Sequence, residues 1–125
     1  MNDVFYITQL SIISKDVSPI IFQLGYVCDA LLEDWLSIRS DDMHMTLDFV
    51  RDQRQYIPLG ETAQSKYDKL HASTIIIVSF HNKNYEQLLE ILEQLLAQLG
   101  GWVACDDDWN IFYTVSTIKN INCIS

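Results

Sequence analysis

The sequence is poor in positive charge. Of its 125 residues only 8 are Lys or Arg, whereas 17 are Asp or Glu, so the formal net charge is −9. Proteins that bind nucleic acids attract phosphates with faces rich in Lys and Arg, and a chain this acidic repels them. We therefore expect no nucleic-acid partner, and basic proteins are the better electrostatic match.

Long apolar runs and paired cysteines are also missing. The most apolar stretch, residues 17–32, is interrupted by Pro19, Gln23, Gly25 and Asp29, so we expect no membrane-spanning segment. The first residues carry no positive charge and no small-residue cleavage site, which argues against a secretory signal. The three cysteines are odd in number and lack C-x-x-C spacing. This pattern favours reduced thiols in a cytoplasmic protein over a disulfide framework or a zinc site.

The usual catalytic and cofactor motifs are absent. The sequence contains no nucleophile elbow, no P-loop, no dinucleotide fingerprint and no His-Glu-x-x-His. We therefore expect no enzymatic activity and no cofactor. One alternative remains, because His44-Met45-Thr46 resembles the histidine-x-threonine element of two-histidine phosphoesterases, with His71 as the second histidine. That reading requires both imidazoles to reach one phosphate as general acid and base; otherwise His44 is an exposed strand histidine.

The order of predicted elements indicates the fold class. No repeat, linker or low-complexity tract divides the chain, so we predict a single domain over residues 1–125. The patterns predict, in order, a strand at 4–13, a helix from Ser18–Pro19 to Trp35, a half-buried strand at 44–49, a short helix near 62–70, a central strand at 73–80, a helix from Asn84 to Leu99, and a closing hairpin of 102–105 with 111–118. Short connections then favour an α+β fold, with a single-layer antiparallel sheet and two main helices on one face, ferredoxin-like or a close variant.

The negative charge is unevenly distributed. Residues 39–83 contain as many bases as acids, whereas residues 84–118 contain six acids and no base. These six are Glu86, Glu90, Glu93, Asp106, Asp107 and Asp108. The three glutamates follow one face of the predicted second helix without the Lys partners that stabilise such faces. The pattern favours a surface that attracts a basic partner, the alternative being that acidity serves solubility alone.

The run Asp106-Asp107-Asp108-Trp109 allows three interpretations. Asp106 and Asp108 could share a hard cation such as magnesium or calcium, although no other acid is tied to them by spacing. The run could instead be a solvated turn. In the third interpretation it is an acidic patch that faces a partner, with Trp109 or Tyr113 as the aromatic anchor.

Several segments together resemble a known group of proteins. They are Ser79-Phe80-His81-Asn82-Lys83-Asn84-Tyr85, the leucine-rich helix to Leu99, Gly100-Gly101-Trp102, and Asp107-Asp108-Trp109-Asn110-Ile111-Phe112-Tyr113. Their order, from Met43 to Ile118, is similar to that in small immunity proteins of bacterial polymorphic-toxin systems, including the contact-dependent growth inhibition and swarming-inhibition types.

This resemblance implies a cytoplasmic protein that binds one cognate toxin domain, in many cases a basic nuclease, and neutralises it without catalysis. No contact residue is carried over from the family. The residues that we expect to contact the toxin come from the charge pattern, and they are Asp106, Asp107, Asp108, Trp109, Glu86, Glu90 and Glu93. A small acidic adaptor or homodimer is the remaining alternative.

Overall fold

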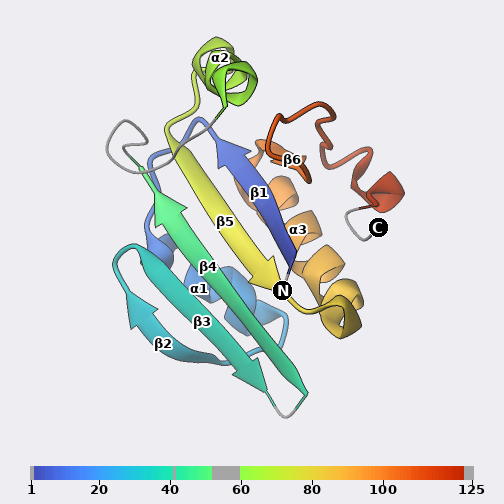
Figure 1. Ribbon diagram of the computed structural model, residues 1–125. Coiled ribbons are helices and arrows are strands. Elements are labelled where there is room, and N and C mark those ends of the chain that lie inside the picture. Colours follow the sequence, from blue (N-terminus) through green and yellow to red (C-terminus); the bar gives the residue numbers. More distant parts are fainter. Residues whose placement is uncertain (1, 41, 52–59, 123–125) are drawn as a thin grey trace.

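The computed structural model describes residues 2–40, 42–51 and 60–122. Its centre is a six-stranded sheet in the order β2-β3-β4-β5-β1-β6, with every neighbouring pair antiparallel (Figure 1). The strands are β1 (Asn2–Thr8), β2 (Cys28–Leu32), β3 (Trp35–Ser40), β4 (Met43–Val50), β5 (Thr74–Phe80) and β6 (Trp102–Ala104). The helices are α1 (Ser14–Gln23), α2 (Glu61–Lys69) and α3 (Tyr85–Leu99), with short 3-10 turns η2 (Asn82–Asn84) and η3 (Ile118–Asn120).

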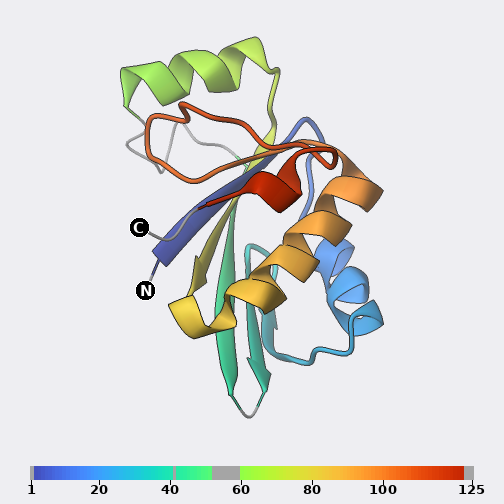
Figure 2. The ribbon, with the colours of Figure 1, turned by 90° about the vertical axis from the view of Figure 1, so that its right-hand side faces the viewer.

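The connectivity confirms the predicted ferredoxin-like α+β arrangement. The elements β1-α1-β4-β5-α3-β6 form a split βαβ unit in which four strands lie in the order β4-β5-β1-β6. Figure 2 shows α1 and α3 on one side of the sheet and α2 on the other. Two insertions extend this unit. The β2–β3 hairpin widens the sheet beyond β4, and α2 lies in the connection from β4 to β5, of which residues 52–59 lie outside the described residues.

Strand β4 shows how sequence alternation sets the two faces of the sheet. Over residues 43–49 its buried residues point towards the helices and its half-buried residues towards the opposite face, where the buried Val50 also packs. The buried set that packs in the helix-side core is Met43, Met45, Leu47 and Phe49. The half-buried set is His44, Thr46 and Asp48. The predicted half-buried strand is therefore confirmed, since successive side chains of a strand point to opposite faces.

Helix α3 is also confirmed, because its apolar residues recur at three- and four-residue spacing and are buried. It ends at Gly100, which has φ +71°. The Tyr6 hydroxyl lies 2.5 Å from the carbonyl oxygen of Gly100 and 3.3 Å from that of Leu95, and so joins β1 to the C-terminal end of the helix. Gly101 is required for a different reason: a Cβ there would lie 2.3 Å from the carbonyl oxygen of Ile7 on β1.

The predicted helix from Ser18 to Trp35 is wrong in both of its boundaries. The helix begins at Ser14, and the Asp16 carboxylate at its first turn accepts a hydrogen bond from the Ile13 amide at 2.9 Å. It ends after Gln23, where Gly25 takes φ +89° and the chain turns into the β2–β3 hairpin. The apolar residues of this stretch suit a helix stripe and a strand almost equally well, and the pairing of β2 with β3 selects the strand.

The predicted closing hairpin is mostly wrong. Among the described residues beyond β6 a single bridge forms, between Val103 and Tyr113, through backbone hydrogen bonds of 2.9 and 2.8 Å. The chain then turns at Thr114, whose amide donates to the Thr117 hydroxyl at 2.9 Å, and continues into η3. Local side-chain hydrogen bonds of this kind compete with strand pairing, which accounts for the short ladder.

The cysteines do not all match the expected reduced state. Cys28 is a free thiol, and burial, with a further contribution from Asp29, raises its pKa. Cys105 is disulfide-bonded, so the prediction of reduced thiols is wrong for this residue. Cys123 lies outside the described residues. Spacing alone could not reveal the bond, because disulfide pairing depends on the folded chain.

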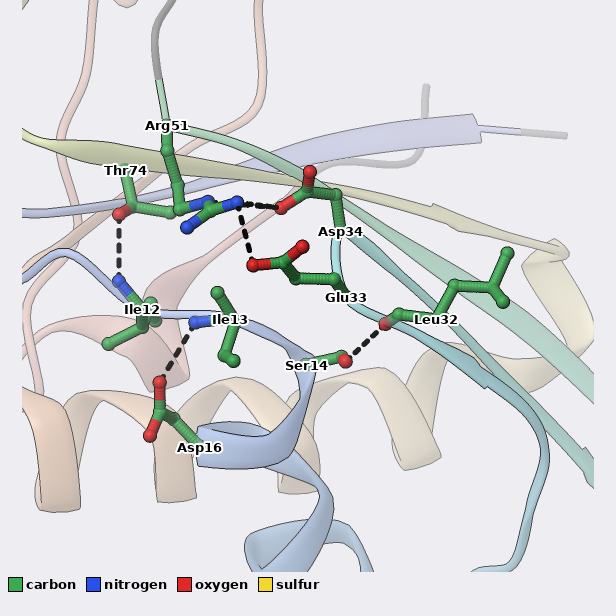
Figure 3. A network of polar contacts seen from close by, with 9 residues as sticks. All are labelled: Ile12, Ile13, Ser14, Asp16, Leu32, Glu33, Asp34, Arg51 and Thr74. Atoms are coloured by element: carbon green, nitrogen blue, oxygen red, sulfur yellow. Dashed lines mark hydrogen bonds and ion pairs between the residues drawn. The ribbon is translucent and has the colours of Figure 1, made fainter.

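The outer edge of the sheet, at β2, is partly closed by the start of α1 (Figure 3). The Ser14 amide donates to the Glu33 carbonyl at 3.0 Å, and the Ser14 hydroxyl donates to the Leu32 carbonyl. At the hairpin turn the Arg51 guanidinium contacts the Glu33 carboxylate at 3.4 Å and that of Asp34 at 2.9 Å. The hairpin is thus bonded to both α1 and the end of β4.

Candidate protein interface

The three glutamates of α3 lie along its outward side. Glu86 and Glu90 are exposed and Glu93 is half-buried. None of the three takes part in the ion pairs found within residues 2–40, 42–51 and 60–122, which involve only Arg39 and Arg51. The row of carboxylates predicted from the spacing is therefore present and has no cation paired to it in the described part of the chain.

One carboxylate of this row is held in place by a tyrosine. The Tyr26 hydroxyl, in the segment after α1, donates a hydrogen bond of 2.7 Å to Glu90. Burial, followed by the hydrogen bond to Glu90 and its negative charge, raises the pKa of Tyr26 to about 12. Tyr26 therefore remains a hydrogen-bond donor at neutral pH, and it orders Glu90 without neutralising it.

Two exposed apolar side chains lie near Tyr26 in the sequence, Phe22 in the last turn of α1 and Val27 in the segment between α1 and β2. Phe22 is 59% exposed and Val27 is 58% exposed. Their sequence neighbours reach α3, because Gln98 donates to Gln23 at 3.2 Å and Tyr26 donates to Glu90. We call the group Glu86, Glu90, Glu93, Tyr26, Phe22 and Val27 the acidic helix face. The sequence did contain a signal for Phe22, which lies off the stripe formed by its apolar neighbours in α1, but the signal was missed.

The run from Asp106 to Trp109 forms a tight turn. One oxygen of the Asp106 carboxylate accepts the Asn110 amide at 2.9 Å, and the other accepts the Asn110 side-chain amide at 3.2 Å. The Trp109 amide donates to the Asp106 carbonyl at 3.2 Å, and Trp109 itself takes φ +54°. Asp106 therefore shapes the turn, as Asp commonly does, whereas Asp107 and Asp108 are exposed.

Trp109 is not an exposed anchor, and this prediction is wrong. Its side chain is fully buried. The indole packs among aromatic rings, with centroids 6.1 Å from Phe5, 6.4 Å from Tyr67 and 6.2 Å from Phe112. The polar neighbours of Trp109 in sequence suggested exposure, but the rings that bury it come from β1 and α2. Tyr113, the other candidate anchor, is half-buried and paired to β6 through its backbone.

A lysine from the electrically balanced middle of the chain lies against this turn. The Lys66 ammonium donates to the carbonyl of Trp109 at 2.7 Å and to that of Asp108 at 3.4 Å, and it lies 5.9 Å from the centre of the Phe112 ring. In the sequence, Lys66 lies far from the three aspartates. The fold brings the Lys66 ammonium to the turn that contains them, so its positive charge partly offsets their negative charge.

The two acidic sets occupy different sides of the molecule. The glutamates lie on α3, in the helix layer, whereas the Asp106–Trp109 turn packs with α2 on the opposite side of the sheet (Figure 2). The seven predicted contact residues therefore do not form one surface. The acidic helix face is the better candidate interface, because it combines unpaired charge with an exposed aromatic ring.

The structure does not bring His44 and His71 together. His44 lies at the start of β4, with its Nε2 atom 3.4 Å from the Ser37 hydroxyl. His71 lies beyond the opposite end of the paired strands, between α2 and β5. The paired residues Met45–Val50 lie between them, a span of roughly 17 Å at about 3.3 Å per residue. Two imidazoles at opposite ends of a strand cannot hold one phosphate, so the phosphoesterase alternative has no site.

Neither a metal centre nor a catalytic set emerges from the described residues. Within residues 2–40, 42–51 and 60–122 no group of three or more His, Cys, Asp or Glu side chains could hold a metal ion. A hollow of about 440 Å³ lies at the β2 edge. It is lined by Ile13, Ser14, Lys15, Leu31, Leu32 and Glu33. This lining is mainly apolar and contains no pairing of a nucleophile with a base.

Comparisons with protein-family models, curated proteins and solved structures found no match to this chain. Among the described residues, no helix is both long enough and apolar enough to cross a bilayer.

Proposed function

We propose that this protein is an immunity-type inhibitor that binds a basic toxin domain through the acidic helix face, without catalysis. The observation that carries the proposal is the row of three α3 glutamates, which have no cation paired to them among the described residues. On α1, Phe22 adds an aromatic side chain that is 59% exposed. Exposed carboxylates attract a basic partner over long range, and a desolvated aromatic side chain supplies affinity at short range.

The arrangement of the glutamates argues against solubility as their only role. Glu86 and Glu90 are four residues apart, and Glu90 and Glu93 are three apart, so each adjacent pair lies on one side of the helix. Like charges at these spacings destabilise a helix by a few tenths of a kcal/mol per pair. A surface suited only to solubility would mix both signs and avoid this cost.

An inhibitor of this kind acts by occupying a surface. Basic nucleases bind the phosphates of their substrate with Lys and Arg, and carboxylates on a second protein can occupy the same groups. Binding is then fast at low ionic strength and slows as salt is added. No bond is made or broken, which agrees with the absence of catalytic motifs in the sequence.

Two observations point to different compartments. The sequence analysis favours the cytoplasm, whereas the disulfide at Cys105 favours an oxidising compartment such as a bacterial periplasm. A toxin domain can be neutralised in either place. Cell fractionation with marker proteins, combined with thiol labelling of Cys105 under native conditions, would distinguish the two locations.

The direct test is co-expression with the toxin domain encoded immediately upstream. We expect growth to be rescued and a stable complex to be recovered. The triple variant Glu86→Gln, Glu90→Gln, Glu93→Gln should weaken the complex. The matched control, Glu61→Gln, Asp107→Asn, Asp108→Asn, removes the same charge from the opposite side of the sheet and should weaken it less. Absence of both rescue and binding would sink the proposal, and equal effects of the two variants would show that only net charge matters.

A further inference from the structure

Among the described residues, no helix covers the face of the sheet opposite α1 and α3 over β3 and β4. In Figure 1 no helix lies in front of these two strands. The strand register places Trp35 of β3 directly opposite Asp48 of β4, and Asp48 directly opposite Ile77 of β5. Residues paired in this way have Cβ atoms about 4.5–5.5 Å apart. Asp48 is thus a carboxylate between an indole ring and an aliphatic side chain.

Asp48 has no partner for its charge. Its side chain is half-buried, and no hydrogen bond or ion pair to it is found within residues 2–40, 42–51 and 60–122. Burial raises its pKa, and the nearby charge of Asp34 raises it further. A carboxylate that loses water without gaining a partner destabilises the folded state. A cation supplied from outside the described chain would remove that penalty.

The other charges near this face are already paired. The Arg39 guanidinium contacts Asp29 at 3.2 Å, and the Arg51 guanidinium contacts Asp34 at 2.9 Å. At the neighbouring strands the Ser79 hydroxyl donates to the Asp3 carboxylate at 2.6 Å. Asp48 is therefore the carboxylate of this face that remains without a hydrogen-bonding or ionic partner among the described residues.

The surroundings of Asp48 fit one kind of cation. A guanidinium is planar, stacks on an indole ring and donates two parallel hydrogen bonds to a carboxylate, whereas an ammonium makes only a point contact. We propose that the Trp35–Asp48–Ile77 site binds an arginine side chain presented by a protein partner. Trp35 stacks on the guanidinium, Asp48 binds it, and Ile77 packs against the aliphatic stem. This inference shares with the proposed function only the assumption of a basic protein partner, and it concerns a different surface.

The first experiment uses a peptide as the probe. The full-length protein is titrated with acetyl-Gly-Gly-Arg-Gly-Gly-amide and with its lysine counterpart, while NMR follows the indole N–H signal of Trp35. We expect the arginine peptide to shift this signal more than the lysine peptide. The variant Asp48→Asn should weaken arginine-peptide binding by about tenfold, because a charge-assisted bidentate contact is lost. Asp107→Asn, which removes the same charge elsewhere, should change it less than about twofold.

The arginine site would be overturned if Asp48→Asn and Asp107→Asn weakened binding of the arginine peptide equally. It would also be overturned if the arginine and lysine peptides shifted the Trp35 signal equally. Asp48→Asn preserves side-chain shape and breaks no hydrogen bond or ion pair found among the described residues, so loss of folding is not expected to obscure the result. A second readout separates this inference from the proposed function. If rescue from the toxin is unchanged by Asp48→Asn and Trp35→Ala but is lost without the α3 glutamates, the arginine site is overturned in that complex and the proposed inhibitor function is supported. Selective binding of the arginine peptide without any rescue would support the arginine site and contradict the inhibitor function.

Discussion

Two stretches of this chain have the same charge in the sequence and different roles in the structure. The glutamates of α3 have no paired cation among the described residues, and one of them is positioned by the Tyr26 hydroxyl. The Asp106–Trp109 turn uses Asp106 to hold its own backbone, buries Trp109, and lies against the Lys66 ammonium. The first stretch is available to a partner, whereas much of the second stabilises the fold.

Charge density along a sequence therefore does not measure the charge that is available at a surface. A carboxylate engaged by an amide two or four residues away is an element of a turn. A carboxylate in the interior of a long helix, such as that of Glu90 or Glu93, has no local amide to accept from, because the backbone amides there are already bonded. The secondary structure around an acidic residue therefore decides its role.

The largest expected effect is on stability, at Trp109. Trp109→Ala should reduce the free energy of unfolding by about 3–5 kcal/mol, because it empties the centre of an aromatic cluster. Urea denaturation followed by circular dichroism measures the change. Trp35→Ala, which truncates a half-buried tryptophan on the face of the sheet opposite α1 and α3, should cost less. A Trp109→Ala protein of unchanged stability that no longer bound its partner would restore Trp109 as an exposed anchor.

The next effect is on binding kinetics, at the α3 glutamates. Glu86→Gln, Glu90→Gln, Glu93→Gln should lower the association rate with a basic toxin domain by roughly tenfold at low salt, since long-range attraction is reduced. Stopped-flow measurements over a range of salt concentrations report both the rate and its salt dependence. The same variant should unfold at slightly higher urea, because like-charge repulsion on α3 is removed.

The matched triple variant at Glu61, Asp107 and Asp108 tests whether the two acidic regions differ in their contribution to binding. It should change the association rate less than the α3 variant does, because its charges lie on the side of the sheet away from α3. If the two variants slowed association equally, the division into an available and an engaged acidic region would have no functional meaning.

A smaller effect is expected at Asp106. Asp106→Ala should lower the free energy of unfolding by about 1 kcal/mol, because it removes the acceptor for the Asn110 amide and side chain at an exposed position. Asp107→Ala, its exposed neighbour without such bonds, should stay within about 0.5 kcal/mol of the parent protein. Thermal unfolding of the two variants in parallel measures the difference, and equal losses would contradict the turn-forming role of Asp106.

The smallest effect is a pH-dependent one at Asp48. Its pKa is raised in the folded state, chiefly by burial, so the folded protein holds this proton more tightly than the unfolded chain. The contribution of Asp48 to stability is therefore present at acidic pH and is lost as pH rises through the raised pKa. Asp48→Asn should consequently be more stable than the parent at neutral pH, by a few tenths of a kcal/mol after allowance for solvent screening. The difference should vanish in acid; urea titrations at several pH values test this.

The elements predicted correctly from the sequence are those whose hydrophobic pattern fits only one type of secondary structure. Residues 44–49 alternate strictly, and the leucines after Tyr85 keep helical spacing for fifteen residues, so β4 and α3 were identified correctly. The stretch from Leu24 to Trp35 was misread because its apolar residues satisfy a helical spacing and also line a hairpin. Sheet register, which pairs Leu31 of β2 with Leu36 of β3, decides between them, and register is a property of the whole sheet.

The candidate interface was predicted only in part. The glutamate row could be found because helical spacing is a local property. The burial of Trp109 could not, because the rings around it, Phe5 and Tyr67, are far from it in the sequence. The same holds for Asp48, whose setting between Trp35 and Ile77 arises from three strands that only the folded sheet brings side by side.

The bonds from Ser14 to the β2 edge have a consequence for how molecules of this protein behave towards one another. An edge strand with free carbonyls is a template onto which a strand from a second molecule can add, and repeated addition produces aggregates. Here the carbonyls of Leu32 and Glu33, at the hairpin end of β2, are already bonded to Ser14. An incoming strand would have to unwind the first turn of α1 before it could pair along the whole β2 edge. The start of this helix therefore disfavours polymerisation by strand addition at this edge.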